Sequence, residues 1–360
     1  MRTKTFLIMA GGTGGHVYPA LATAKNLQQH HDKIAWLGSV GGMEESIVAQ
    51  TDIPFFGISI KGVRGNGVLV KLLSPFRLLW AVLQAISVIY KVKPDCVLGM
   101  GGFASGPGGL AARLMGKPLL IHEQNAVAGL TNRMLAKIAN SVMAAFPHAF
   151  DKKMKVTLVG NPLSQNICDI YYRPKTAIPA ARNVRLLVLG GSLGAARLNE
   201  CVPETMALLD DSIRPDVWHQ TGRQHDLKAV ERYQSRGVEA KVTPYIDDMG
   251  EAYQWADFVV CRAGALTVSE LCVAGLGAIL VPYPYAVDDH QTLNAKLMVS
   301  AGAAWLLPQS DLDPVTLAEI LRPLLNKRER IALLSNSAHK LGKPDATEKV
   351  AAECRRVCYA

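Results

Sequence analysis

Residues 6–16 read Phe-Leu-Ile-Met-Ala-Gly-Gly-Thr-Gly-Gly-His, a short apolar run that stops at a glycine-rich turn. Residues 19–29 follow with the pattern of a helix. The same order returns where residues 184–195 read Val-Arg-Leu-Leu-Val-Leu-Gly-Gly-Ser-Leu-Gly-Ala, followed by a helix-like stretch over 197–209. Each passage predicts a strand that leads through a glycine turn into a helix. The chain therefore begins both of its halves in the same way.

Apolar runs of strand length continue through both halves, with helix-length stretches between them. They lie at residues 34–37, 96–100, 119–122, 141–145, 217–220, 258–261 and 278–281. This alternation predicts an α/β domain with a mostly parallel sheet in each half, and 360 residues exceed the usual length of a single core. We expect two Rossmann-like domains that face a central cleft. They should span residues 1–162 and 163–342, with a C-terminal helix over 343–360 that returns to the first domain.

The composition limits the partners and the compartment. A net charge of +9 should attract phosphates, nucleic acid or an acidic membrane leaflet. Aromatic residues make up only 6% and do not interleave with a dense basic run, so we expect no nucleic-acid partner. Seven cysteines without a C-x-x-C pair indicate a reducing compartment. The first apolar run is too short for a signal peptide, and no uninterrupted apolar segment reaches the ~18 to 20 residues of a spanning helix. These features predict a cytoplasmic protein.

A third glycine loop strengthens the case for anion binding. Residues 99–109 hold six glycines in eleven positions after another strand-like run. A single such loop could be only a packing turn, and neither G-x-G-x-x-G nor G-x-x-x-x-G-K-[ST] occurs, which disfavours a dehydrogenase or a P-loop enzyme. Three loops at strand ends favour a phosphate site, because glycine lets backbone N–H groups approach a ligand closely. Ligands of such sheets bind at the carboxyl ends of the strands.

Five motifs together resemble, in order and spacing, those of the MurG family, the lipid I N-acetylglucosaminyltransferases. They are residues 11–16, residues 99–109, the run His122-Glu123-Gln124-Asn125, residues 190–192 and residues 262–270. The resemblance spans nearly the whole chain. It implies the GT-B fold and an inverting transfer of N-acetylglucosamine (GlcNAc) from UDP-GlcNAc to the C4 hydroxyl of N-acetylmuramic acid (MurNAc) in lipid I, which gives lipid II for peptidoglycan synthesis.

The resemblance also implies that no metal or other cofactor is needed. The sequence has neither a D-x-D cluster nor a His/Cys ligand set. We therefore expect loop N–H groups and helix dipoles to meet the charge of the pyrophosphate.

The second half is expected to bind the donor. Residues 264–270 follow a strand and open a helix, so the first N–H groups and the Thr267 hydroxyl can meet a phosphate. The resemblance implies that Glu270 accepts hydrogen bonds from the ribose hydroxyls, although it could be only a helix-start carboxylate. Tyr245 could equally be an ordinary core residue. Ser192 and the run around Gln291 could be helix caps with no contact to a ligand. The predicted donor residues are Thr13, Gly14, Gly15, Asn125, Ser164, Ser192, Tyr245, Ile246, Ala265, Leu266, Thr267, Val268, Ser269, Glu270 and Gln291.

Ser164 departs from the family pattern. The family usually carries an arginine at this position, after Gly-Asn-Pro-Leu, and a serine cannot supply the donors of a guanidinium. Either Arg197 or Arg262 replaces that cation, or donor affinity is lower.

The first half is expected to hold the acceptor and the catalytic base. Gly101, Gly102 and Phe103 should lie against the acceptor diphosphate. Inversion requires an acceptor hydroxyl that loses its proton as it attacks, and an imidazole with a reference pKa of ~6.5 suits that task. His16 is the first candidate for this base. The alternative is that its sole role is a hydrogen bond to the turn. Glu123 is the second candidate.

Residues 69–82 predict an amphipathic helix with Leu72, Phe76, Leu79 and Trp80 at helical spacing. Such a segment with cationic flanks can lie in the interface of an anionic bilayer. A buried helix face would give the same pattern. With Arg64, Arg133 and Lys137 as reinforcement, we expect a peripheral protein on the cytoplasmic face of the bacterial inner membrane.

Two other functions fit parts of this pattern. An enzyme of the same fold could act on another acceptor, as a glycolipid synthase does, or could epimerise UDP-GlcNAc at C2. A non-catalytic nucleotide-sugar-binding subunit is the alternative from another class. Expected partners are UDP-GlcNAc, lipid I and an anionic membrane surface, together with other proteins of cell-wall synthesis and division.

Overall fold

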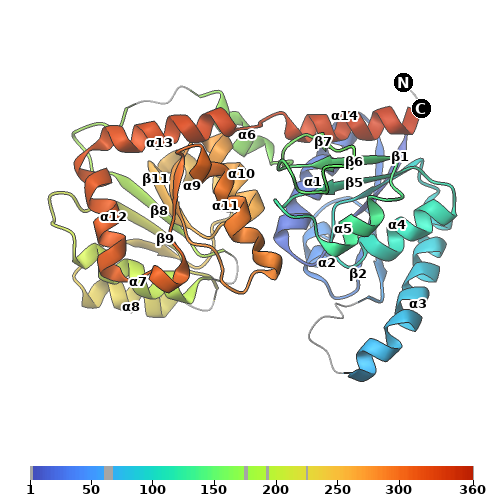
Figure 1. Cartoon of the computed structure of the whole chain (residues 1–360), viewed down its shortest axis with the longest axis horizontal. Coiled ribbons are helices and arrows are strands. Elements are labelled where there is room, and N and C mark those ends of the chain that lie inside the picture. Colours follow the sequence, from blue (N-terminus) through green and yellow to red (C-terminus); the bar gives the residue numbers. More distant parts are fainter. Residues whose placement is uncertain (1–2, 61–67, 174–176, 192–193, 224–225, 360) are drawn as a thin grey trace. The chain divides into compact units, whose positions relative to one another are not determined.

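The computed structural model describes residues 3–60, 68–173, 177–191, 194–223 and 226–359, with the backbone alone over 68–74 and at Val287. Its contacts divide the chain into two compact units. Unit 1 combines Met1–Ser164 with Asp345–Ala360, and unit 2 is Gln165–Pro344. Each unit is an α/β body with its own sheet (Figure 1).

The described part of unit 1 contains a sheet of seven strands in the order β3-β2-β1-β4-β5-β6-β7. The strands are β1 (Thr5–Met9), β2 (Lys33–Ser39), β3 (Phe55–Ile58), β4 (Cys96–Gly99), β5 (Leu119–Glu123), β6 (Ser141–Ala144) and β7 (Thr157–Leu158). All pairs are parallel. The central strands read as apolar runs because helices cover both of their faces.

Helices of unit 1 bury the two faces of this sheet in separate apolar clusters. They are α1 (Gly14–Gln29), α2 (Met43–Val48), α3 (Val68–Val92), α4 (Ser105–Leu114), α5 (Leu130–Leu135) and α14 (Ala346–Tyr359). Val350, Ala351 and Cys354 of α14 are fully buried against the face that α1 covers. The Thr347 hydroxyl also bonds the backbone of Leu163, so the C-terminal segment is fastened to unit 1.

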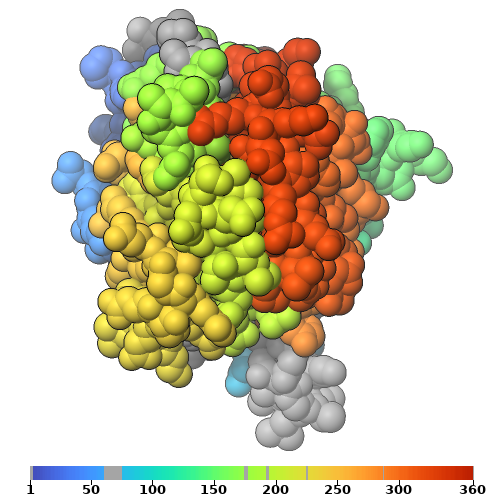
Figure 2. All heavy atoms as spheres, turned by 90° about the vertical axis from the view of Figure 1, so that its left-hand side faces the viewer, coloured from blue at the N-terminus to red at the C-terminus, as the bar shows by residue number. Residues whose placement is uncertain are grey.

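The described residues of unit 2 form a parallel sheet of six strands in the order β10-β9-β8-β11-β12-β13. The strands are β8 (Arg185–Leu189), β9 (Asp216–Gln220), β10 (Lys241–Thr243), β11 (Phe258–Cys261), β12 (Gly277–Leu280) and β13 (Ala304–Leu306). The helices are α6 (Gln165–Tyr171), α7 (Ala196–Ala207), α8 (Asp226–Ser235), α9 (Met249–Trp255), α10 (Ala265–Ala274), α11 (His290–Ser300), α12 (Pro314–Asn326) and α13 (Arg328–Leu341). Helices α8, α7 and α12 lie side by side in this unit (Figure 2).

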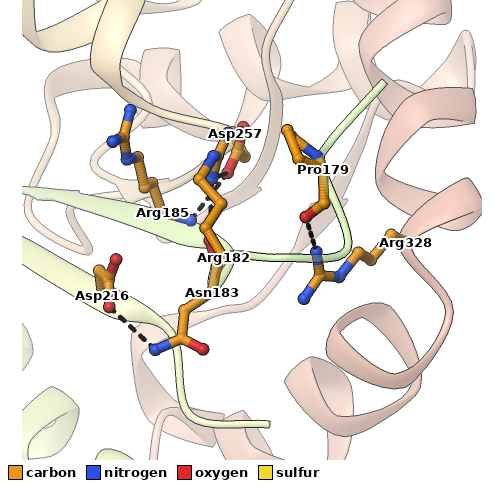
Figure 3. A network of polar contacts seen from close by, with 7 residues as sticks. All are labelled: Pro179, Arg182, Asn183, Arg185, Asp216, Asp257 and Arg328. Carbon is orange, nitrogen blue, oxygen red and sulfur yellow. Dashed lines mark hydrogen bonds and ion pairs between the residues drawn. The ribbon is translucent and has the colours of Figure 1, made fainter. Parts of the chain in front are cut away.

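Polar contacts hold the amino ends of the strands in unit 2 (Figure 3). Arg182 makes two hydrogen bonds to the Asp257 carboxylate, at 2.6 and 2.8 Å, and the same carboxylate accepts the backbone N–H of Arg185. This pairing raises the pKa of Arg182. Asn183 bonds Asp216, and Arg328 donates to the Pro179 carbonyl. The opposite, carboxyl edge is left for the loops expected to bind ligand.

Helix α3 holds the window Pro75–Val92, which is long and apolar enough to cross a membrane by length and composition, with a mean hydropathy of 1.3. A helix of this kind was not expected from the sequence, because Arg77 and Lys91 interrupt the apolar residues. One side of the helix, with Ala81, Val82, Ala85 and Ile89, is buried in the core of unit 1. Helix α3 is therefore packed on its own unit along one side, and its other side remains exposed.

Candidate active site

The first and third glycine loops lie against each other at the carboxyl edge of unit 1. Met100 donates its backbone N–H to the Met9 carbonyl, and the Ser105 hydroxyl bonds the carbonyls of Met9 and Gly101. Gly102 has φ +86°, and a Cβ there would lie 2.3 Å from the Gly11 carbonyl oxygen. Only glycine permits this close approach. Phe103 is half exposed beside it.

Buried Glu44 of α2 fixes the first loop from behind. Its carboxylate accepts the backbone N–H of Gly12 at 3.2 Å and that of Ser39 at 2.8 Å. A Cβ on Gly11 would lie 2.2 Å from Glu44 Oε1, so the missing side chain makes room for this carboxylate. Sequence reasoning missed Glu44, because an acid in the first turn of a helix usually needs no further explanation.

His16 lies in the first turn of α1, next to the predicted acceptor residues. Its Nδ1 lies 3.2 Å from the Gly11 carbonyl oxygen and 3.4 Å from the Thr13 hydroxyl oxygen. Because the carbonyl can only accept, the shorter contact favours the tautomer of the neutral ring with its proton on Nδ1. Nε2 then keeps the lone pair that a general base needs. A Cβ on Gly101 would lie 3.0 Å from Nε2, so the ring edge rests on Gly101. The structure brings together His16, Gly101 and Gly102 as the sequence analysis expected, with Thr13, Gly14 and Gly15 at the start of the same helix.

Glu123 ends β5 and is only 2% exposed. Its Oε1 accepts the backbone and side-chain N–H groups of Asn125, and its Oε2 accepts those of Gly129 and Asn132. Both carboxylate oxygens are engaged by these four donors, which gives Glu123 a positioning role, and its role as second candidate base stays a prediction. Glu123 holds Asn125, which is partly exposed, in place.

The amino end of α10 carries the predicted diphosphate site of unit 2. Gly264 is its N-cap and provides no side-chain cap, so the first N–H groups of Ala265, Leu266 and Thr267 point out of the helix. Val268 is buried, and the Ser269 hydroxyl bonds the Ala265 carbonyl, which leaves Thr267 as the hydroxyl nearest the helix end. The macrodipole of α10 adds partial positive charge there.

Glu270 lies one turn further along α10. Its Oε2 accepts a 2.8 Å hydrogen bond from Tyr253, and no hydrogen bond to Oε1 is found among the described residues. Burial raises the pKa of Glu270 to about 7, and the hydrogen bond from Tyr253 opposes that rise. The free oxygen can accept a ligand hydroxyl, as the ribose prediction requires.

The predicted uracil site lies before α9. Ile246 is buried and Tyr245 partly exposed, with the Arg223 guanidinium 5.3 Å from the centre of the Tyr245 ring. Arg223 follows β9 and was not singled out from the sequence, because nothing near it marks a binding loop. Gln291 accepts the backbone N–H of Tyr283 through Oε1, so its amide already braces the neighbouring loop.

Both arginines named as substitutes at Ser164 make contacts within unit 2. Arg262 donates to the carbonyls of Val281 and Pro282 and to the Gln309 side chain. Arg197 bonds the Leu312 carbonyl and lies 3.8 Å from Glu200. Both guanidiniums brace loops of unit 2, and the replacement of the missing cation by either one stays a prediction. Ser164 itself is exposed.

Three predicted residues lie outside what the structure describes: Arg64, Ser192 and the side chain of Leu72. Among the side chains that are described, no group of three or more His, Cys, Asp or Glu residues could hold a metal ion. The independence from metal stays a prediction.

Comparison with known proteins agrees with this arrangement. Residues 6–144 match the N-terminal domain of glycosyltransferase family 28, and residues 185–350 match its C-terminal domain. The chain belongs to glycosyltransferase family 28. The predicted GT-B fold class, with two parallel-sheet α/β domains, is thereby confirmed.

Family 28 relatives resemble the chain over its full length. Proteins from Marinobacter nauticus and Hahella chejuensis are 52% and 51% identical to it. The alignments cover 98% of the chain and 97% of the first relative, and 99% of the chain and 99% of the second. Both relatives are named UDP-N-acetylglucosamine--N-acetylmuramyl-(pentapeptide) pyrophosphoryl-undecaprenol N-acetylglucosamine transferase. The crystal structure of Acinetobacter baumannii MurG matches with a TM-score of 0.83 and 40% identity, over 98% of this chain and 99% of that one.

Proposed function

We propose that this family 28 enzyme transfers GlcNAc from UDP-GlcNAc to the C4 hydroxyl of MurNAc in lipid I, with inversion, and so makes lipid II for peptidoglycan synthesis. The observation that carries the proposal is the identity of about half of all residues, over the whole chain, with relatives named for this reaction. The loops of both units support it, because each unit presents backbone N–H groups at its carboxyl edge.

In this proposal His16 is the catalytic base. Its Nε2 takes the proton of the acceptor hydroxyl while the oxygen bonds to the anomeric carbon of GlcNAc. The bond from that carbon to UDP breaks, and the electron pair leaves with UDP. The contact of Nδ1 with the Gly11 carbonyl supports this role, because it favours the tautomer with the proton on Nδ1 and also stabilises the imidazolium that forms.

The donor binds in unit 2. The amino end of α10 takes the diphosphate, Glu270 takes the ribose hydroxyls, and Tyr245 and Ile246 take the uracil. Helix dipoles and N–H groups stabilise the negative charge that grows on the leaving diphosphate, so we propose that neither a metal nor another cofactor is needed.

The exposed side of α3 is proposed to lie on an anionic membrane. Phe76 and Trp80 are 72% and 58% exposed, and Leu79 lies between them, which excludes a buried face for these residues. Exposed apolar residues continue on α4, which packs against α3, and on α5, which packs against α4 (Figure 1). They are Leu110, Leu114, Leu130 and Met134, with Arg113 and Arg133 on the same helices and Lys137 in the turn that follows α5. A peripheral location on the cytoplasmic face of the inner membrane follows, where proteins of cell-wall synthesis and division are further proposed partners.

The proposal is tested by measuring UDP release from UDP-GlcNAc with and without a short-chain lipid I analogue. We expect release only with the acceptor. Epimerised sugar without acceptor would instead indicate a UDP-GlcNAc 2-epimerase, and no turnover in either condition would indicate a binding subunit.

A further inference from the structure

Tyr253 of α9 is buried in unit 2, and its hydroxyl lies 2.8 Å from Glu270 Oε2. Burial and the nearby Glu270 carboxylate hold the pKa of Tyr253 well above its usual range, so the phenol keeps its proton and acts as the donor. A phenol with a fixed ring has few rotamers, so it holds the acceptor carboxylate in one orientation.

This hydrogen bond divides the two carboxylate oxygens of Glu270 between two tasks. Oε2 is occupied by Tyr253, and Oε1 has no hydrogen bond among the described residues. A glutamate side chain loses rotamer freedom when it is ordered, and this loss of entropy opposes binding. If Tyr253 orders the carboxylate beforehand, a bound ligand does not have to do so.

The position of Tyr253 in the chain links two parts of the donor site. Residues 245–246, at the proposed uracil site, lead directly into α9. Asp248 caps this helix by accepting the N–H groups of Gly250 and Glu251, and Asn166 of α6 bonds the same carboxylate oxygen. A short, well-capped helix thus connects the proposed uracil site to Tyr253, the residue that holds Glu270.

We propose that Tyr253 is a positioning residue of the donor site, which aims Glu270 at the ribose hydroxyls and thereby sets the preference for ribonucleotide donors. This inference rests on the proposed donor site. It adds to that site a residue that does not touch the substrate.

The test compares the binding of UDP and 2′,3′-dideoxy-UDP by calorimetry in wild type, Tyr253→Phe and Glu270→Ala. We expect wild type to prefer UDP by about 100-fold, because hydrogen bonds to a charged carboxylate are lost with the hydroxyls. Tyr253→Phe should lower this preference about tenfold by weakening UDP alone, with dideoxy-UDP affinity unchanged. In turnover, KM for UDP-GlcNAc should rise about tenfold while kcat stays within about twofold.

Tyr233→Phe is the matched control. Tyr233 is also buried in unit 2, and its hydroxyl bonds His219 Nδ1 at 2.9 Å instead of a proposed ligand residue. It should keep the wild-type preference. If Tyr253→Phe lowers the melting temperature strongly, Tyr253→Met removes the same donor and is measured in its place.

The outcomes separate the two proposals. An unchanged preference in Tyr253→Phe, or an equal loss for both nucleotides, would overturn the positioning role while Glu270→Ala still loses the preference. If Glu270→Ala keeps the full preference for UDP, the donor site itself is wrong, and the role of Tyr253 is overturned with it.

Discussion

Gly102 is the residue whose substitution should be least tolerated. Its φ of +86° disfavours any side chain, and a Cβ would meet the Gly11 carbonyl at 2.3 Å, so the two glycine loops would have to separate. We predict that Gly102→Ala lowers kcat/KM for the acceptor at least about tenfold, through displacement of His16. Gly116→Ala is the control, because Gly116 has φ +67° with nothing near its Cβ position. Equal activity of both variants would contradict this account of the loops.

His16 should affect turnover more than binding. We predict that His16→Ala lowers kcat by about 10² to 10⁴, the usual contribution of a general base, and leaves the Kd for UDP-GlcNAc within about threefold. Calorimetry and steady-state kinetics on the same preparation measure both quantities. A loss confined to Kd, with kcat intact, would assign His16 to binding.

Glu270 should make donor binding depend on pH. Burial raises its pKa to about 7, so the carboxylate is ionised above that pH and becomes protonated as the pH falls through it. We predict that affinity for UDP decreases from pH 8 to pH 6, because the protonated group accepts hydrogen bonds less strongly. The pKa of Glu270 is higher in the folded protein than in the unfolded chain. Ionised Glu270 therefore lowers the free energy of unfolding above pH 7, and this loss disappears as the pH falls. Glu270→Gln should flatten the binding profile; a profile unchanged by this substitution would assign the titration to another group.

At the scale of single residues, the sequence predicted which residues lie together better than it predicted what each side chain does. The glycine motifs placed His16 beside Gly101 and Gly102, because motif spacing and sheet topology together determine which loops meet. The tasks of Glu123, Arg262 and Arg197 were not predictable, because their hydrogen-bond partners lie on other elements. Tyr253 and Glu44 were missed for the same reason.

Helix α3 carries the prediction for membrane binding at the scale of elements. Replacing Phe76 and Trp80 together by serine should reduce binding to anionic vesicles about tenfold or more, because each ring loses its apolar contact with the bilayer. Vesicle sedimentation measures the change. In the control variant, serine replaces Tyr172 and Leu227, which lie in unit 2 and are 72% and 75% exposed. This variant should bind the vesicles as wild type does. Unchanged binding in the α3 variant, with folding intact, would exclude this face.

The amino edge of the unit 2 sheet should contribute stability without contributing to catalysis. Asp257 pairs with Arg182 and accepts the Arg185 N–H, with its side chain 11% exposed (Figure 3). We predict that Asp257→Ala lowers the free energy of unfolding by about 2 kcal/mol, less than for a fully buried pair because Arg182 is partly solvated. Chemical denaturation measures this. A large loss of kcat at temperatures where the variant is fully folded would contradict the assignment.

At the scale of the whole molecule, the fold class followed from the sequence because the pattern of strand, glycine turn and helix repeats in both halves. The apolar pattern of residues 69–82 was ambiguous, since a buried face and a membrane face share the same spacing. Only the structure separates the buried side of α3, with Ala81 and Ala85, from the exposed side, with Phe76 and Trp80.

The central claim is a metal-independent transfer of GlcNAc to lipid I. The most direct measurement is mass spectrometry of the lipid product after incubation of the purified chain with UDP-GlcNAc and a lipid I analogue in EDTA. The account predicts a product heavier by one N-acetylhexosamine residue, formed at the rate seen without EDTA and absent with His16→Ala on the same timescale. An unmodified lipid, while UDP-GlcNAc is consumed or remains intact, would contradict it.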